Sequence, residues 1–324
     1  MSVGAIGRES NTGNKRRRNE DSFVVAPPLF AVADGMGGAQ AGEVASKLAA
    51  AALEDTDPGS AGGEERVVAL IQEANRRVYE RSNADPAASG MGTTITAALV
   101  EGTRVTFGHV GDSRAYLLRG GVMEQLTEDH SLVNELMKSG KLSPEEAETH
   151  PQRSVITRAL GTDPDVDVDT FVVEAQEGDL FLICSDGLTT MVGDEDILEL
   201  LERHHDDLDR AAKSLVAAAN RAGGEDNITV VAFTISAGGG DTVQVPAAGA
   251  DDDTLEGMPP PPAIDTMVVP PEQVEAALLV PGSPEALAAV RREPITSAAR
   301  VRLVLTMVVL LTVAAVLLVW GLLR

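Results

Sequence analysis

Five short acidic clusters lie along the first 227 residues, and most of them follow a strand-like apolar run. They are Asn19-Glu20-Asp21, Asp34-Gly35-Met36-Gly37-Gly38, Gly111-Asp112-Ser113-Arg114, Ser185-Asp186-Gly187 and Glu225-Asp226-Asn227. Strands that pack together bring their ends together, so carboxylates far apart in the sequence are expected to meet. Because a pocket of like charges repels itself unless cations fill it, the pattern predicts a site for hard divalent metals and therefore a reaction.

The cluster at Asp34 shows how such a ligand set is built. Asp34 ends the apolar run 29–33, and the glycines at 35, 37 and 38 are expected to let the backbone turn and bring a carbonyl to a metal. Mg²⁺ and Mn²⁺ both take oxygen ligands of this kind. One Asp-Gly turn is weak evidence, but Asp186 and Asp226 adjoin apolar runs in the same way. These matching contexts favour a shared site over independent turns.

Residues 1–236 alternate strand and helix patterns. The predicted strands are 23–26, 29–33, 94–101, 104–110, 114–119, 170–174, 180–184 and 228–235. The predicted helices are 41–53, 64–82, 131–138, 194–203 and 208–222. Many strands at hairpin spacing, with amphipathic helices outside them, predict an α+β layered domain with antiparallel sheets.

Charge and cysteine content narrow the classes of function. The formal net charge of −24 argues against nucleic-acid binding, which depends on phosphate neutralisation by Lys and Arg. Cys184, the only cysteine, lies in the apolar run 180–183. A buried, inert thiol is therefore expected there, not a nucleophile.

Residues 237–299 are predicted to form a disordered acidic linker. The segment from Ser236 to Ala299 carries 10 of the 17 prolines and no aromatic residue, so it buries too little to offset its ordering entropy. It also repeats Asp-Thr-apolar at Thr242, Thr254 and Thr266. Either the repeat is chance in a low-complexity tail, or the threonines are phosphorylated and dock a phosphothreonine-reading domain.

Residues 300–324 are predicted to be one transmembrane helix. The run 303–323 holds no charged residue, and a helix of that length matches the bilayer core. Arg300 and Arg302 precede it, which places the N-terminal side in the cytoplasm by the positive-inside rule. The alternative is a buried core helix, which the lack of any amphipathic face disfavours. The expected protein is thus a single-pass protein of the cell membrane with its folded domain in the cytoplasm.

The motifs in residues 1–236 resemble a known family. Arg16-x-x-Asn19-Glu20-Asp21, Asp34-Gly-Met-Gly-Gly38, Gly92-Thr93-Thr94, Gly111-Asp-Ser-Arg114, Ser185-Asp-Gly187 and Asp226-Asn227 occur in this order. The order is similar to that of the metal-dependent (type 2C) serine/threonine protein phosphatases, and the bacterial membrane-anchored members that oppose Hanks-type kinases look most similar. The resemblance implies two antiparallel sheets sandwiched between helical layers.

The resemblance also implies a role for each residue of the site. Asp34 would bridge two metals, Mn²⁺ or Mg²⁺, with the Gly35 carbonyl on one of them. Glu20 would serve the second metal and Asp21 would orient metal-bound water. The remaining roles are implied for Asp186 and Asp226 on the first metal, Asp112 with Asp186 on a weaker third metal, and Arg16 on the substrate phosphate.

One position departs from part of the family. Some eukaryotic members carry a His directly after the Asp-Gly, proposed as general acid, whereas this chain has Met36. His130 and His150 do not obviously replace it, and His130 is expected to be structural. His150 lies within a segment, about 131–160, that resembles the mobile flap of the family.

The favoured interpretation is a phosphatase of phosphorylated serine and threonine in proteins, opposing a Ser/Thr kinase. Two alternatives are a membrane-tethered scaffold with a phosphatase-like domain and a phosphatase of an anti-sigma-factor antagonist. Missing carboxylates would favour the scaffold, and none is missing. Phosphatases of anti-sigma-factor antagonists usually carry sensor domains, and the sequence shows none.

Overall fold

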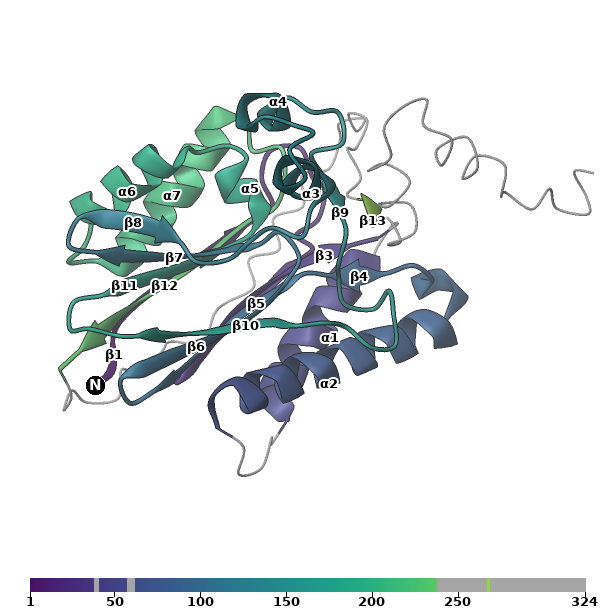
Figure 1. Cartoon of the computed structure of the whole chain (residues 1–324), viewed down its shortest axis with the longest axis horizontal. Coiled ribbons are helices and arrows are strands. Elements are labelled where there is room, and N and C mark those ends of the chain that lie inside the picture. The colour runs from purple at the N-terminus through teal and green to yellow at the C-terminus, as the bar shows by residue number, and fades with distance from the viewer. Residues whose placement is uncertain (38–40, 57–61, 238–266, 269–324) are drawn as a thin grey trace, which may run out of the picture. The chain divides into compact units, whose positions relative to one another are not determined.

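Two antiparallel β-sheets lie face to face in the computed structural model, which describes residues 1–37, 41–56, 62–237 and 267–268 (Figure 1). One sheet has the strand order β1 (Ser2–Asn11), β12 (Ile228–Ser236), β11 (Leu180–Cys184), β7 (Arg114–Arg119) and β8 (Val122–Gln125). The other has the order β10 (Asp169–Glu174), β6 (Arg104–Val110), β5 (Ile95–Glu101), β3 (Leu29–Met36) and β2 (Asp21–Ala26), and β4 (Gly92–Thr93) pairs with β3.

Helices cover the outer face of each sheet. The second sheet packs against α1 (Ala41–Asp55) and α2 (Gly63–Ala84), and a 3₁₀ turn, η1 (Pro86–Ala88), follows α2. The first packs against α5 (Asp186–Thr189), α6 (Asp194–Arg203) and α7 (Leu208–Ala222). The predicted α+β sandwich of antiparallel sheets is therefore confirmed. All the described residues belong to one compact unit, Met1–Pro271.

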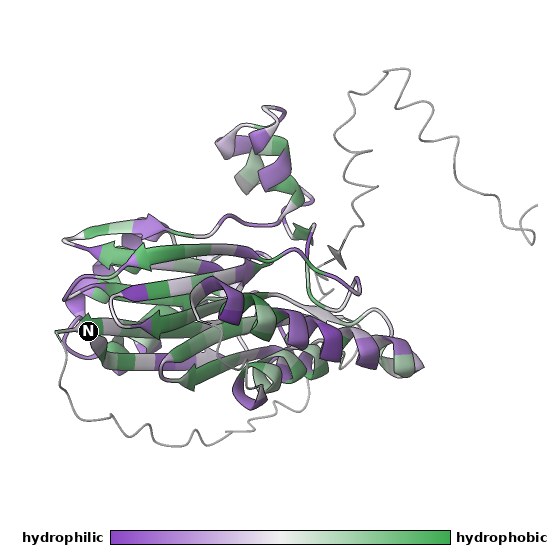
Figure 2. Cartoon of the chain, turned by 60° about the horizontal axis from the view of Figure 1, so that its bottom comes forward, coloured by the Kyte–Doolittle hydropathy of each residue, from purple (hydrophilic) through white to green (hydrophobic). Residues whose placement is uncertain are grey.

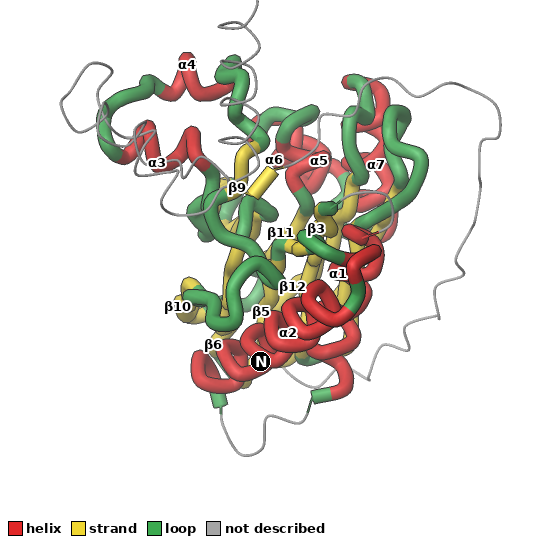
Figure 3. The backbone as a smooth tube through the Cα atoms, turned by 90° about the vertical axis from the view of Figure 1, so that its right-hand side faces the viewer, coloured by secondary structure: helices red, strands yellow, loops and turns green. Residues whose placement is uncertain are grey.

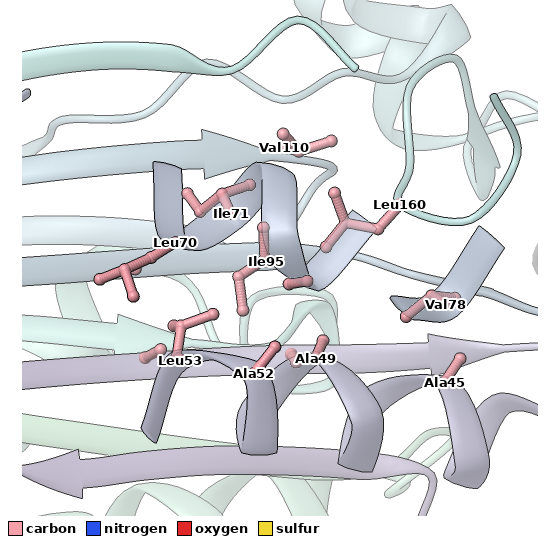
Figure 4. Packing of buried hydrophobic residues seen from close by; sticks show 14 of the residues in the cluster. Ala45, Ala49, Ala52, Leu53, Leu70, Ile71, Val78, Ile95, Val110 and Leu160 are labelled. Atoms are coloured by element: carbon pink, nitrogen blue, oxygen red, sulfur yellow. The ribbon is translucent and has the colours of Figure 1, made fainter. Parts of the chain in front are cut away.

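The helices form where apolar residues recur at helical spacing. In α2 the buried positions include Val67, Ile71, Ala74 and Val78, which share one face of the helix. Figure 4 shows this face packed with Ala45, Ala49 and Ala52 of α1 and with Ile95 of the sheet, all within one apolar cluster. Figure 2 shows the apolar residues concentrated along the strands and the hydrophilic ones on the exposed helix faces.

The layer between the two sheets holds most of the phenylalanines. Phe30 and Phe233 stack with ring centroids 4.1 Å apart, and Phe181 stacks on Phe233 at 5.3 Å. Phe107 lies 5.7 Å from Phe181, and all four rings are fully buried. The low aromatic content of the chain is thus concentrated where the two sheets meet.

Replacing Phe233 with Ala should destabilise the domain by about 3–5 kcal/mol. The substitution removes a buried ring and its stacking contacts with Phe30 and Phe181, and it leaves a cavity. The measurement is urea unfolding of the domain, in which the midpoint falls while the slope stays constant. Phe23→Ala is the matched control, since Phe23 is only half-buried. Equal losses from the two variants would contradict the packing argument.

Most of the predicted elements agree with the structure. The helices agree within a few residues, and strands 104–110, 114–119 and 180–184 agree at both ends. Missing from the predicted elements are β1, β4, β8, η1 and the short helices α5 and α4 (Pro144–Glu148), together with the two-residue strand β9 (Val155–Ile156). The strand predicted to end at Ala33 continues as β3 through Asp34 to Met36.

The predicted flap, about 131–160, contains α3 (Leu132–Lys138), α4 (Pro144–Glu148) and β9 (Val155–Ile156). The helices α3 and α4 stand away from the two sheets (Figure 3). Of the predicted linker 237–299, the described residues are Ala237 and the short strand β13 (Met267–Val268). The predicted transmembrane segment 300–324 and Thr242, Thr254 and Thr266 lie outside the described residues. Within the described residues, no helix has both the length and the apolarity to cross a membrane.

Candidate metal centre

The register of two neighbouring strands brings the first two acidic clusters together. In the antiparallel pair β2 and β3, Asp21 lies directly opposite Asp34. Asp21 is buried and accepts a hydrogen bond at Oδ2 from the hydroxyl of Ser185, at 2.9 Å. Since Ser185 directly precedes Asp186, this bond joins two of the predicted acidic clusters, and the pairing of Asp21 with Asp34 adds the third.

Two threonines fix the backbone at Asp34. The Asp34 amide donates to the hydroxyl of Thr94 at 3.0 Å, and the Thr93 hydroxyl donates to the Asp34 carbonyl at 2.8 Å. The Thr94 hydroxyl also shares a hydrogen bond of 2.8 Å with Ser113, which follows Asp112. The Gly92-Thr93-Thr94 motif was visible in the sequence, but its task of tying Asp34 to the Asp112 loop was not predicted.

Gly35 occupies a crowded part of strand β3. A Cβ there would lie 2.2 Å from the carbonyl oxygen of Gly42 and 2.5 Å from that of Glu20, so only glycine fits. The sequence prediction that Gly35 serves a tight turn is therefore wrong, because close packing between α1 and the Glu20 segment requires it. The backbone leaves the extended conformation two residues later, at Gly37, where φ is +146°.

Asp112, Asp186 and Asp226 complete the cluster, and the pKa shifts show how closely the carboxylates interact. Burial raises the pKa of Asp34, and Asp21, Asp186, Asp226 and Asp112 raise it further. Burial likewise raises the pKa of Asp186, and Asp112, Asp226 and Asp21 add to the effect. Like charges gathered this closely disfavour ionisation. The structure thus brings together the four predicted aspartates around Asp34.

The carboxyl groups at the edge of the cluster shift in the same direction. Burial raises the pKa of Asp21 to about 6 and that of Asp112 to about 7. Burial also raises the pKa of Glu20 to about 7, against the opposing effect of Arg16. A bound cation would reverse these shifts, because positive charge favours the ionised carboxylate.

The residues fit a site for divalent cations. Oδ1 of Asp21 and Oδ1 of Asp186 are buried without a hydrogen-bond partner, which leaves two oxygens available as ligands. Among the described residues, no three His, Cys, Asp or Glu side chains are arranged closely enough to hold a metal ion as they stand. Backbone carbonyls and waters would supply the remaining ligands, as Mg²⁺ and Mn²⁺ commonly require.

Arg16 lies beside the acidic cluster, and its guanidinium donates to Oδ2 of Asp226 at 2.7 Å. Both side chains are about one quarter exposed, at 22% for Arg16 and 27% for Asp226. The arginine therefore faces the open side of the centre, where it can exchange a carboxylate for another anion. Its planar fork of donors suits a phosphate group.

Asn227 holds the segment that carries Arg16 and Glu20. Its side-chain amide donates to the carbonyls of Thr12 and Arg18 at 2.9 and 2.8 Å, and its Oδ1 accepts from the Glu20 amide at 2.8 Å. Asn227 is buried. The sequence showed Asp226-Asn227 as a motif but gave no sign of this positioning role.

The remaining residues that the sequence analysis considered lie outside the centre. His130 is buried, its Nδ1 accepts from the Gly111 amide at 3.0 Å, and its Nε2 bonds Asp169, which supports the structural role expected for it. Arg114 pairs with Asp129 at 2.7 Å. Met36 packs with Ile156 and Ala159. Cys184 is buried, and burial raises the pKa of its thiol to about 12, so it is not a nucleophile.

Residues 14–222 match the family described as protein phosphatase 2C. The serine/threonine protein phosphatase PstP of Mycobacterium tuberculosis is 42% identical over 251 residues, which are 76% of this chain and 48% of that protein. The chain thus matches about half the length of this relative. The serine/threonine phosphatase stp of Listeria innocua is 43% identical over 233 residues, which are 68% of this chain and 92% of that protein.

Solved structures show the same fold. The crystal structure of the Mycobacterium tuberculosis phosphatase PstP/Ppp has a TM-score of 0.69 and 41% identity, and it covers 73% of this chain and 100% of that one. The catalytic domain of PstP in complex with two manganese ions has a TM-score of 0.67 and 40% identity, with the same coverage. The family implied by the sequence motifs and the family found by comparison are thus the same.

Proposed function

Because this chain belongs to the protein phosphatase 2C family, we propose that it hydrolyses phosphoserine and phosphothreonine in phosphorylated proteins at a centre of two Mn²⁺ or Mg²⁺ ions. The observation that carries the proposal is the group of carboxylates around Asp34, in which Asp21 and Asp186 each keep a buried oxygen without a partner. Relatives named as serine/threonine phosphatases and a solved relative with two manganese ions support it.

In this proposal the chain's own residues hold the cations and the substrate. Asp34 and the Gly35 carbonyl, with Glu20 on one side and Asp186 and Asp226 on the other, would hold two ions, and Asp112 with Asp186 a weaker third. Bound divalent cations would lower the pKa of a water and neutralise charge on the phosphoryl oxygens. Asp21 would orient the attacking water with its Oδ1, while the Ser185 hydroxyl holds its Oδ2.

Arg16 would bind the substrate phosphate. Asp226, which pairs with Arg16 in this structure, would bind a metal ion instead once cations occupy the centre. The guanidinium would then exchange this carboxylate for two phosphate oxygens and stabilise their charge during in-line attack. With Met36 after Asp34-Gly35, the proton for the leaving hydroxyl must come from a source other than a side chain at position 36.

Hydrolysis of a phosphothreonine peptide by residues 1–236 tests this function. Turnover should require Mn²⁺ or Mg²⁺ and stop when a chelator is added. Phosphoserine peptides and a phosphoserine anti-sigma-factor antagonist, tested beside it, identify the substrate class. A folded domain that binds metal but releases no phosphate from any of them would favour the scaffold function.

We also propose that the protein is a single-pass protein of the cell membrane, with the 1–236 domain in the cytoplasm, a 237–299 linker that is disordered on either side of β13, and a 300–324 transmembrane helix. The uncharged run 303–323 and the preceding arginines support this. Membrane fractionation of the full chain beside a chain ending at residue 299 tests it. Recovery of both in the soluble fraction would contradict the anchor.

The proposed partners follow from the substrate class and from the linker. A phosphatase of phosphothreonine needs a Ser/Thr kinase to supply its substrates, so we propose that it opposes one. Thr242, Thr254 and Thr266 would, when phosphorylated, bind a phosphothreonine-reading domain. Mass spectrometry after treatment with the cell's kinases tests the second proposal, and the absence of phosphate from all three threonines would overturn it.

A further inference from the structure

The predicted flap carries a strand that pairs with a distant segment of the chain. In β9 and β13, which run parallel, Val155 pairs with Met267 and Ile156 pairs with Val268 (Figure 1). The segment 237–266 separates β13 from the end of the domain at Ser236. Its 30 residues can extend to on the order of 100 Å, so the tether allows this pairing without strain.

The strand β9 is joined to the candidate metal centre by packing. Ile156 is buried, and it contacts Met36 and Ala159 in a small apolar cluster. Met36 ends strand β3 directly after Asp34 and Gly35. A restraint on β9 is therefore a restraint on the part of the flap that touches the Asp34 strand.

The base of the flap is also tied to the Asp112 loop. Ile156 forms an antiparallel bridge with Ser131, and the Thr157 amide donates to the His130 carbonyl at 2.8 Å. The His130 amide in turn donates to the carbonyl of Gly111 at 2.8 Å. On one side β9 thus contacts its own domain, and on the other it pairs with β13.

The chain's own segment 267–268 occupies that second side through backbone pairing. Strand addition uses main-chain hydrogen bonds, so any extended peptide of suitable sequence can compete for the same edge. The arginines beside β9 are already paired within the domain, Arg153 with Glu225 and Arg158 with Asp169, so the commitment to the chain's own segment comes from the backbone pairing.

We propose that the edge of β9 is a docking site for an extended peptide, that the chain's own segment Met267–Val268 occupies it, and that the docked tail restrains the flap and limits access of phosphoproteins. The effect on turnover rests on the proposed phosphatase function, whereas the docking itself does not. Displacement of β13 by a phosphoprotein segment, or its release, would free the flap edge beside the centre.

The test uses the full chain with Met267 and Val268 both replaced by Pro, which removes both backbone donors of β13. Met267→Leu with Val268→Ile is the matched control, because it keeps both donors. A second control places the two prolines at Val243 and Gln244. Hydrogen exchange of residues 150–160 should become faster by roughly threefold or more in the first variant and stay unchanged in both controls.

Activity gives the second readout. The first variant should raise kcat/KM for a phosphoprotein roughly threefold and leave hydrolysis of a small aryl phosphate unchanged, since only a protein substrate needs the flap edge. Unchanged exchange would overturn the docking, and faster exchange with unchanged kcat/KM would overturn the restraint on substrates. Faster exchange in a chain that hydrolyses no phosphate ester would leave the docking in place and refute the phosphatase function.

Discussion

Replacing Asp34 with Asn is expected to reduce phosphate-ester hydrolysis by roughly a thousandfold or more, a loss of about 4 kcal/mol of transition-state stabilisation. The substitution keeps the size of the side chain but removes the charge at the centre of the carboxylate group. Four aspartates raise the pKa of Asp34, so a cation bound at this position is stabilised by the charge of the whole group. Phosphopeptide hydrolysis at saturating Mn²⁺ measures the loss, and Mn²⁺ titration calorimetry measures the weaker metal binding.

The same variant should be more stable than the unchanged protein when both are free of metal. An uncharged amide in place of the Asp34 carboxylate would relieve the like-charge repulsion with Asp21, which lies directly opposite on β2. Thermal unfolding in chelator measures this, and the expected increase in Tm is a few degrees, on the order of 1–2 kcal/mol. The control Asp165→Asn changes an exposed aspartate, and it should alter neither Tm nor turnover. A variant that loses both activity and stability would indicate a purely structural role for Asp34.

In chelator, the Tm of the unchanged domain should fall as the pH rises from 5 to 8. The folded pKa is about 6 for Asp21 and about 7 for Glu20 and Asp112, all above the usual carboxyl range near 4. At a pH between the unfolded pKa and the folded pKa of a carboxyl group, the folded state holds more protons than the unfolded state. The stability that these groups contribute is therefore complete below the unfolded pKa and is lost as the pH rises through the folded pKa.

The fall should be on the order of 10 °C, because one unit of pKa shift corresponds to about 1.4 kcal/mol and several buried carboxyl groups contribute. Mn²⁺ at pH 8 should restore the Tm, since a bound cation stabilises the ionised carboxylates. Asp34→Asn should flatten the pH profile in chelator. A Tm that rises between pH 5 and pH 8 without metal would show that these groups ionise freely in the folded domain.

From the sequence, the residues of the site were easier to predict than their arrangement in space. Most of the acidic residues needed for the centre adjoin an apolar run that forms a strand, so convergence of the carboxylates followed from the packing of strands. The sequence did not reveal that Asp21 faces Asp34, because strand register depends on pairing across the sheet. It also did not reveal the positioning roles of Asn227 and Thr94, because each hydrogen-bonds residues far away in the sequence.

The N-terminal strand β1 shows why some elements were missed. Gly4 and Gly7 break the apolar alternation that identifies a strand, and glycine disfavours strands. In the structure, a Cβ at Gly7 would lie 2.1 Å from the Leu208 carbonyl at the start of α7. The glycine is required by helix packing, and pairing with β12 along its length stabilises the strand.

Amino-acid sequence alone determined the family, the order of most strands and helices, and which aspartates gather around Asp34, because these depend on residue identity and on local periodicity. Only the tertiary structure decided which strands are neighbours, which carboxylates face each other, and that the flap strand β9 pairs with residues 267–268. The physical reason is that register, burial and like-charge repulsion arise between segments that are distant in the chain, and no local pattern encodes them.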